Sequence, residues 1–159
     1  MNSMKHHADP SNYNLIFFLP IVTFILHTLE ELPDFPNWVS KHFGPMSIPE
    51  FAVLHIPLIW FVLWVSYRAA ATDSTSAWRF WAYAAQWQFA FNAVFHLGAS
   101  AAFGDYSPGM VTAATVALPA TFFMTARCHQ HGLLSKGQAL RACGVGGIIA
   151  IMVVGTLFV

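Results

Sequence analysis

The sequence contains little charge. Only 9% of its 159 residues are Asp, Glu, Lys or Arg, whereas soluble domains carry about 25%. Hydrophobic residues make up 57% of the chain, which excludes an ordinary soluble domain and predicts a membrane protein. The formal net charge is zero, so the basic surface that nucleic-acid binding requires is missing and no nucleic-acid partner is expected. Cysteine is also scarce, because Cys128 and Cys143 are the only two and lack the CxxC spacing of a metal site.

Apolar segments account for most of the chain. Five are long enough to cross a bilayer, which requires about 20 residues of helix. They lie near 14–32, 48–68, 78–103, 109–127 and 140–159. The sequence therefore predicts an all-α fold, a polytopic membrane helix bundle with about five transmembrane helices. We expect a cytoplasmic polar tail over 1–12 and a single transmembrane helical domain over 13–159.

The basic residues are distributed unevenly about these spans. Only Lys41 falls on the side opposite the N-terminus. The others fall on the side of the N-terminus: Lys5, Arg68, Arg79, Arg127, Lys136 and Arg141. Short loops rich in Lys and Arg stay in the cytoplasm. We therefore predict a multi-pass protein of the cell membrane, with the N-terminus cytoplasmic and the C-terminus outside.

Local signals predict what lies between the spans. Loop 33–47 contains three prolines and a glycine, which favours turns over helix. Ser47 and Glu50 have the spacing of a capping box at the start of the second span. Ser107-Pro108 predicts the start of the fourth span, as a cap followed by proline in the first helical position. The last span is rich in small residues, which favours close packing and makes it a candidate homodimer interface.

The alternating directions of the spans bring their polar residues to one membrane face. Three histidines, one from each of the first three spans, would lie at the same depth, roughly 8–10 Å inside the outer helix ends. Polar side chains in apolar helices face one another, because lipid would leave them unsatisfied. The residues that meet there are His27, Glu30, Glu31, His55, Asn92 and His96.

Imidazole and carboxylate groups are ligands of zinc, iron and manganese. At 100° per residue, Glu30 and Glu31 lie to either side of His27 on one helix face. We therefore predict a divalent metal site of one or two ions, with Glu30 or Glu31 as the bridge in the second case. The predicted ligands are His27, Glu30, Glu31, His96 and His55.

Other residues have predicted roles around this metal. The carboxylate of Glu30 or Glu31 that does not bind metal is the predicted general base, and Tyr106 is a candidate proton donor. The start of the fourth span would direct free N–H groups from around Gly109 toward the same place, which favours an anion or a polarised oxygen. Asn92, Pro108 and Gly109 are the predicted cofactor-binding residues.

Three short motifs follow one another along the chain. They are His27-Thr28-Leu29-Glu30-Glu31, Asn92-Ala93-Val94-Phe95-His96 and Tyr106-Ser107-Pro108-Gly109. In order and spacing they resemble the HXXEE family of small integral membrane proteins, over roughly residues 14–125. The resemblance implies a multi-span membrane protein in which these motif residues matter, and it implies no activity. His55 lies outside the motifs, so its place in the site rests on topology alone.

Three functions fit these residues. The first is a metal-dependent integral membrane enzyme, a hydrolase or an oxygen-using oxidoreductase, that acts on a lipophilic or amphipathic small molecule or lipid. The second is a proton or divalent-cation transporter, or an accessory subunit, that uses the same cluster. The third is a structural metal or hydrogen-bond clasp. Five spans without an internal repeat favour the enzyme over the carrier.

Overall fold

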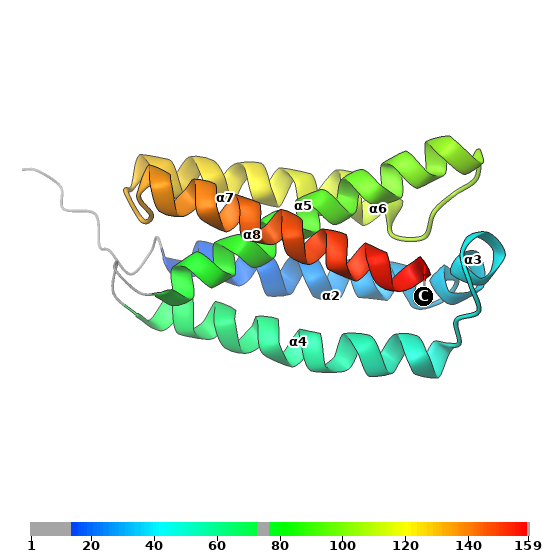
Figure 1. The fold of residues 1–159 in the computed structure, drawn as a ribbon. Coiled ribbons are helices and arrows are strands. Elements are labelled where there is room, and N and C mark those ends of the chain that lie inside the picture. The colour runs from blue at the N-terminus through cyan, green and yellow to red at the C-terminus, as the bar shows by residue number, and fades with distance from the viewer. Residues whose placement is uncertain (1–13, 73–76, 159) are drawn as a thin grey trace, which may run out of the picture.

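The computed structural model describes residues 14–72 and 77–158, and every regular element in them is helical (Figure 1). The elements are η1 Leu15–Phe18, α2 Leu19–Glu31, α3 Phe35–His42, α4 Ile48–Ala71, α5 Ala77–Phe103, α6 Met110–Thr112, η2 Ala113–Ala117, α7 Leu118–Gln130, α8 Lys136–Gly155 and η3 Thr156–Phe158. The predicted all-α fold is confirmed. The predicted polar tail, 1–12, lies outside the described residues.

Several of these helices have the length and composition of membrane spans. Within the described residues, Ile48–Ala71, Met110–Gln130 and Lys136–Phe158 are long and apolar enough to cross a bilayer. A fourth span results if Leu15–Glu31 and Phe35–His42, which are bent by 69°, form one broken span. α5 is 27 residues long but carries more polar side chains. The described part of the chain therefore has three or four helices that are long and apolar enough to span a membrane, and the predicted number of five does not follow from length and composition.

α5 is the central helix of the bundle. It crosses the bundle obliquely and packs against α2, α4, α7 and α8 (Figure 1). Its contact with α8 is close at Gly146, where an added Cβ would lie 2.5 Å from the carbonyl oxygen of Ala84. This glycine of the last helix therefore serves packing within the chain. The predicted homodimer through α8 remains a prediction.

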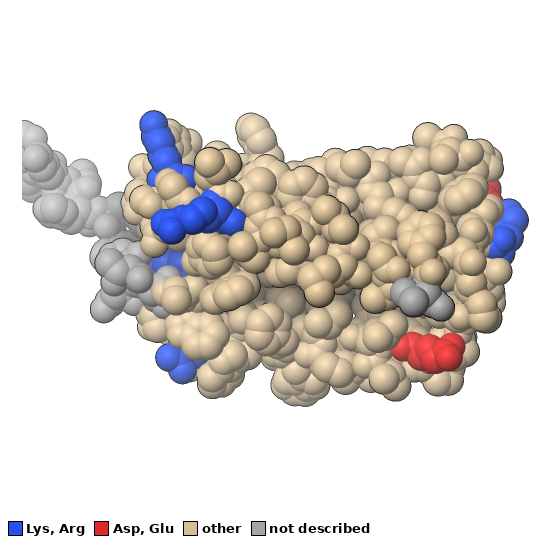
Figure 2. Space-filling view, viewed as in Figure 1, with Lys and Arg blue, Asp and Glu red and all other residues tan. Residues whose placement is uncertain are grey.

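The two ends of the bundle differ in charge. Most of the Lys and Arg side chains visible in Figure 2 gather at one end, whereas an acidic patch and a further basic patch lie at the other. We call the first the basic end, defined by Arg68, Arg79, Arg127, Lys136 and Arg141. We call the second the α3 end, because α3 covers it (Figure 1). Asn14 bonds Arg79 and the Phe158 ring contacts Phe43, so the two ends of the described chain lie at opposite ends of the bundle.

The prediction of turns over 33–47 is wrong for most of that segment, because α3 occupies Phe35–His42. Pro36 stands in the first helical turn, where its missing N–H leaves no helical hydrogen bond broken. Phe35, Trp38 and Val39 form the buried face of α3 and pack on Phe51. α3 is therefore a short amphipathic helix that lies across the end of the bundle.

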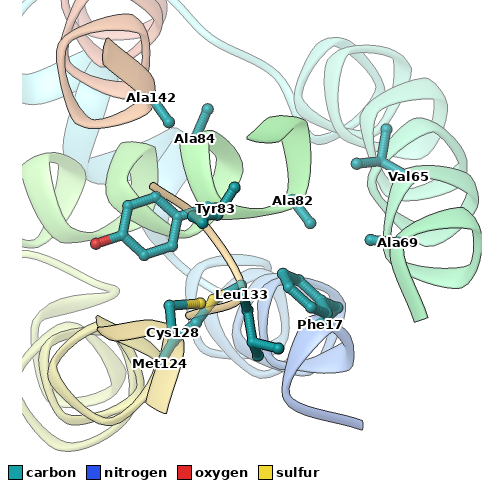
Figure 3. Close-up of a cluster of buried hydrophobic side chains, with 11 residues drawn as sticks. Phe17, Val65, Ala69, Ala82, Tyr83, Ala84, Met124, Cys128, Leu133 and Ala142 are labelled. Carbon is teal, nitrogen blue, oxygen red and sulfur yellow. The ribbon is translucent and has the colours of Figure 1, made fainter. Parts of the chain in front are cut away.

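Apolar side chains fill the basic end of the bundle. Figure 3 shows part of this cluster, in which Phe17 from η1 and Tyr83 from α5 face side chains from α4, α7 and α8. Met124 and Cys128 of α7 are fully or almost fully buried in it. Above it, toward the α3 end, the amide of Gln86 bonds the hydroxyl of Thr121 at 3.0 Å. The bundle is therefore closed at the basic end by packed side chains.

Candidate metal centre

The carboxylate of Glu31 is the centre of a buried polar cluster. Glu31 is the last residue of α2 and is only 3% exposed. Its Oε1 lies 3.3 Å from Nε2 of His96 and 3.4 Å from Nε2 of His27, and its Oε2 lies 3.6 Å from Nε2 of His55. Three histidines from α2, α4 and α5 thus direct the same ring nitrogen at one carboxylate. The predicted meeting of His27, His55 and His96 is borne out by these distances.

The other nitrogen of each imidazole is held by the protein. Nδ1 of His55 donates to the carbonyl of Phe51 at 2.8 Å, since a carbonyl can only accept. Nδ1 of His27 lies 2.9 Å from the hydroxyl of Thr112. That hydroxyl can donate to the carbonyl of Gly109 at 3.3 Å, which leaves its oxygen free to accept from His27. With Nδ1 protonated, each Nε2 presents a lone pair.

His96 completes the same pattern from the middle of the bundle. Its side chain is fully buried, and its Nδ1 lies 3.0 Å from the hydroxyl of Ser107. Its Nε2 makes no hydrogen bond to any part of the chain that the structure describes. Histidines that bind metal commonly donate their second N–H to a fixed acceptor, which orients the ring. The arrangement of His27, His55 and His96 has this form.

The spacing of the cluster fits the size of a small metal ion. One nitrogen each of His27 and His96 and one oxygen of Glu31 lie within 4.8 Å of one another, and all three residues are buried. Ligand atoms about 2.1 Å from an ion in tetrahedral coordination are roughly 3.4 Å apart. The two separations measured from Glu31 Oε1, 3.3 and 3.4 Å, match this value.

Gly109 forms the wall behind the two imidazoles. Its φ is +102°, a conformation that L side chains rarely adopt. A Cβ added to it would lie 2.7 Å from Cε1 of His27 and 2.8 Å from Cε1 of His96. The glycine therefore lets the backbone approach both rings. This is a packing role, whereas the sequence predicted that Gly109 and Pro108 bind a cofactor; Pro108 is itself buried.

Glu30 lies outside the cluster. Its carboxylate accepts hydrogen bonds from the backbone N–H groups of Val111 at 2.9 Å and Thr112 at 2.6 Å, and from the hydroxyl of Tyr106. Burial and the neighbouring carboxylate raise the pKa of Tyr106 to about 12, so its phenol stays protonated. The free N–H groups at the start of the fourth helix, which were predicted to attract an anion, thus donate to the carboxylate of Glu30. The structure brings neither Glu30 nor Tyr106 to the three imidazoles.

The prediction that Ser107-Pro108 caps the fourth span is wrong. The helix begins at Met110 after Gly109, and its first N–H groups bind Glu30 instead. Ser107 is free to hold His96, and Thr112 to hold His27. Neither role was predicted from the sequence. The sequence feature that could have indicated them is position, because Ser107 lies inside the Tyr106–Gly109 motif and Thr112 lies one turn beyond it.

Asn92 lies beside the cluster, where its amide nitrogen is 3.0 Å from Nε2 of His27. Because an amide N–H can only donate, this contact also requires a lone pair on Nε2, the same lone pair that a bound ion would take in place of Asn92. Asn92 lines a cavity of about 400 Å³, together with His27, Glu31 and His55. The remaining walls are mostly apolar and come from α2, α4, α5 and α8. Figure 2 shows the surface hollowed between α8 and α4, and we call this space the lateral cavity.

Fold and site together define an all-helical membrane protein with a buried His/Glu cluster at the inner wall of a lateral cavity. The chain belongs to the family described as proteins of unknown function with an HXXEE motif, whose model matches residues 17–124. The match contains all three motifs and ends within α7, before α8 begins. No curated protein and no solved structure matches the chain.

Proposed function

We propose that this protein is a multi-pass membrane enzyme that depends on one divalent metal ion held by His27, Glu31 and His96. The observation that carries the proposal is the buried carboxylate of Glu31, faced by three imidazole nitrogens while the opposite nitrogen of each ring is already hydrogen-bonded. Where Nδ1 carries the ring proton, an Nε2 lone pair faces the carboxylate, and a cation between them stabilises this arrangement. No Lys or Arg is paired with Glu31 among the described residues, so that cation is either a metal ion or a proton on an imidazole. The separations of 3.3 and 3.4 Å, which match those between ligands of one ion, favour the metal.

A single ion fits better than a pair. A second ion would need further carboxylate ligands, and Glu30, the predicted bridge, is committed to the start of the fourth helix. Two imidazoles and one carboxylate are a ligand set typical of zinc, iron or manganese. Three protein ligands leave a coordination position open, as catalytic sites require and structural zinc sites do not.

The lateral cavity supports an enzyme rather than a structural clasp. A clasp would need no space beside the ion, whereas here His55 and Glu31 form part of the cavity wall. When bound, the metal would activate water for hydrolysis or oxygen for oxidation. His55 lines the cavity and its Nε2 lies 3.6 Å from Oε2 of Glu31, so we assign it the exchange of a proton with a molecule in the cavity.

The packing below the cluster does not favour a carrier. Thr23 and Gln86 are buried and bond each other at 3.4 Å, and Gln86 also bonds Thr121. Beyond them lies the apolar cluster of Figure 3. A hydrated path to the basic end would have to cross both layers. Transport therefore receives no support from the described residues.

We also propose five crossings with the basic end in the cytoplasm. The described chain starts at the basic end and finishes at the α3 end, which requires an odd number of crossings. α5 is then the additional span that brings the total to five, and its buried face, for example Gln86, Ala90 and His96, packs inside the bundle. Basic residues at one end support a cytoplasmic N-terminus, an external C-terminus and a site near the outer leaflet.

Elemental analysis of detergent-purified protein tests the metal. Wild type should contain about one equivalent of zinc, iron or manganese, whereas His96→Ala and Glu31→Gln should lose it. His42→Ala is the matched control, because His42 lies at the same end and pairs with Asp105 instead of Glu31. Thermal unfolding of each variant establishes that it is folded. Wild type without metal after metal-supplemented growth, or both cluster variants with full metal, would overturn the proposal.

A further inference from the structure

We infer that the substrate of this site is a long-chain amphiphile, which places one hydrocarbon chain in the lateral cavity and its polar group at the cluster, and which reaches the cluster from the bilayer between α4 and α8. The chemistry at the cluster is that of the proposed function, on which this inference rests. The class of substrate is inferred from the length and polarity of the lateral cavity.

The lateral cavity is long. Its wall includes one face of α5, from Trp81 through Ala85 and Gln88 to Asn92 and Phe95. From Trp81 to Phe95 is fourteen residues, or about 21 Å at 1.5 Å per residue. A volume of about 400 Å³ spread over this length can take an extended hydrocarbon chain.

The polar groups of the lateral cavity lie toward one end. Glu31, His55 and Asn92 stand near its α3 end. The part that runs toward the middle of the bundle is lined by side chains such as Leu58, Phe61 and Val62, with Gln88 as the polar exception. A bound amphiphile would therefore place its polar group at the cluster and its chain along α4 and α5. This is also the orientation of a lipid chain in the outer leaflet.

The two helices on either side of the lateral cavity indicate how a molecule enters it from the bilayer. α4 forms one side of the lateral cavity and α8 the other, and the surface between them is hollowed (Figure 2). Neighbouring side chains on both helices are apolar and exposed, for example Ile56 on α4 and Ile151 on α8. Such faces contact lipid when the bundle is in a membrane. The substrate therefore comes from the hydrocarbon phase instead of from water.

The length of the apolar part sets the length of the chain. Asn92 and Trp81 are eleven residues apart, about 16 Å along α5. An extended chain advances roughly 1.2 Å per bond, since three backbone bonds span about 3.5 Å. Roughly 12–14 carbons beyond the polar group would fill the space.

Photolabelling of metal-loaded protein tests this inference. The probe is a 12-carbon fatty acid with a diazirine near the end of its chain, and a four-carbon acid with the same diazirine is the comparison without a long chain. The 12-carbon probe should label α4 and α8 side chains that line the lateral cavity, and unlabelled 12-carbon fatty acid should compete. The four-carbon acid at the same concentration should leave these side chains unlabelled.

Ala85→Phe supplies the decisive variant. Ala85 lines the lateral cavity about two turns below Asn92 and has no contact with the metal cluster. A phenyl ring there displaces two or more methylene groups, so labelling should fall about tenfold. Ala101→Phe, on the exposed surface of α5, should leave labelling unchanged.

Metal content, measured on the same samples, separates this inference from the proposed function. Normal metal with equal labelling of wild type and Ala85→Phe overturns the long-chain substrate and leaves the metal enzyme standing. Equal labelling of cavity residues by the four-carbon acid overturns it as well. Loss of labelling in Ala85→Phe with one metal ion retained supports it.

Discussion

Glu30 and Glu31 are neighbours on α2, yet their carboxylates have different partners. A rotation of 100° between successive helical residues directs Glu31 into the bundle and Glu30 toward the start of the fourth helix. Glu31 thereby meets three imidazoles. Glu30 meets two backbone N–H groups and a phenol. The two acids of the motif thus have separate contacts: Glu31 with the three imidazoles, and Glu30 with the start of the fourth helix.

Replacing each acid by its amide should therefore have different effects. Glu31→Gln removes the charged ligand, so metal affinity should fall by at least about 100-fold, beyond the loss typical of residues that only orient ligands. Glu30→Gln should keep the metal but destabilise the fold by about 1 kcal/mol, the usual cost of a weakened helix cap. Isothermal titration with zinc and thermal unfolding in detergent measure the two effects. Equal metal loss in both variants would contradict the division.

Gly109→Ala tests the close approach of backbone to imidazole. The added methyl would collide with the rings of His27 and His96, so we expect metal affinity to fall at least about tenfold. The positive φ adds a backbone cost of about 1–2 kcal/mol. Gly104→Ala is the matched control, because Gly104 also has a positive φ, +70°, but has open space around its Cβ. The control should lose stability and retain metal; metal loss in both would attribute the effect to backbone strain.

The sequence predicted His27, Glu31, His55 and His96 because helical periodicity and alternating span direction suffice to place them together. It could not separate Glu30 from Glu31, since both lie within 60° of His27 on the helix surface. The sequence also could not predict which groups bind the Nδ1 nitrogens of the imidazoles. Ser107 and Thr112 contact His96 and His27 because the chain turns at Gly109, which lies between them.

At the scale of elements, α3 is held in place by Asp105. One carboxylate oxygen accepts from Trp38 Nε1 at 3.0 Å, and the other accepts from Lys41 Nζ at 2.6 Å and lies 3.0 Å from His42 Nε2. Asp105 lies in the loop between α5 and α6. The ring of Phe35, at the start of α3, lies 5.5 Å from that of His96. The carboxylate thus joins the helix that covers the site to the loop that supports it.

Periodicity and capping signals predicted the long helices well, since each is an apolar run that ends at recognisable residues. The capping box of Ser47 and Glu50 is present as predicted. The sequence does not predict α3, because the prolines and the glycine of segment 33–47 favour turns. Its formation depends on tertiary contacts, namely the burial of Phe35 and Trp38 and the bond to Asp105.

Acid should loosen the attachment of α3. The hydrogen bonds from Lys41 and Trp38 hold the pKa of Asp105 well below its usual value. A carboxylate with a depressed pKa stabilises the fold fully above its unfolded pKa, about 4, and loses this contribution as the pH falls further. Asp105→Asn should therefore have a lower Tm than wild type at pH 7, and the difference should shrink below about pH 4. Thermal unfolding between pH 7 and 3 measures it.

The partner side chain provides the control for this pH dependence. Lys41→Met removes one of the groups that depress the pKa of Asp105, so it should reproduce part of the same acid-dependent difference. In the double variant, Lys41→Met should add little to the effect of Asp105→Asn, because the charge that Lys41 contacts is already gone. A difference between wild type and Asp105→Asn that persists undiminished at pH 3 would show that the attachment does not depend on the charge.

At the scale of the whole molecule, the lateral cavity gives access to the site from the side of the bundle. The lateral cavity meets the cluster near the α3 end, whereas packed side chains fill the basic end (Figure 3). The packed end is thus also the basic end, and the cavity meets the cluster near the opposite end. A molecule that reaches Glu31 from the lipid between α4 and α8 would therefore react at the depth of one leaflet only.

Which leaflet that is can be measured with two single cysteines. Gly44 lies at the α3 end and Gly137 at the basic end, and an added Cβ meets nothing within 4 Å at either position. With the basic end in the cytoplasm, as proposed from its Lys and Arg residues, Gly44→Cys should react with a membrane-impermeant maleimide on intact cells, and Gly137→Cys only after permeabilisation. Wild type, with Cys128 buried and Cys143 half-buried, gives the background. The reverse pattern would place the metal site and its substrate in the inner leaflet.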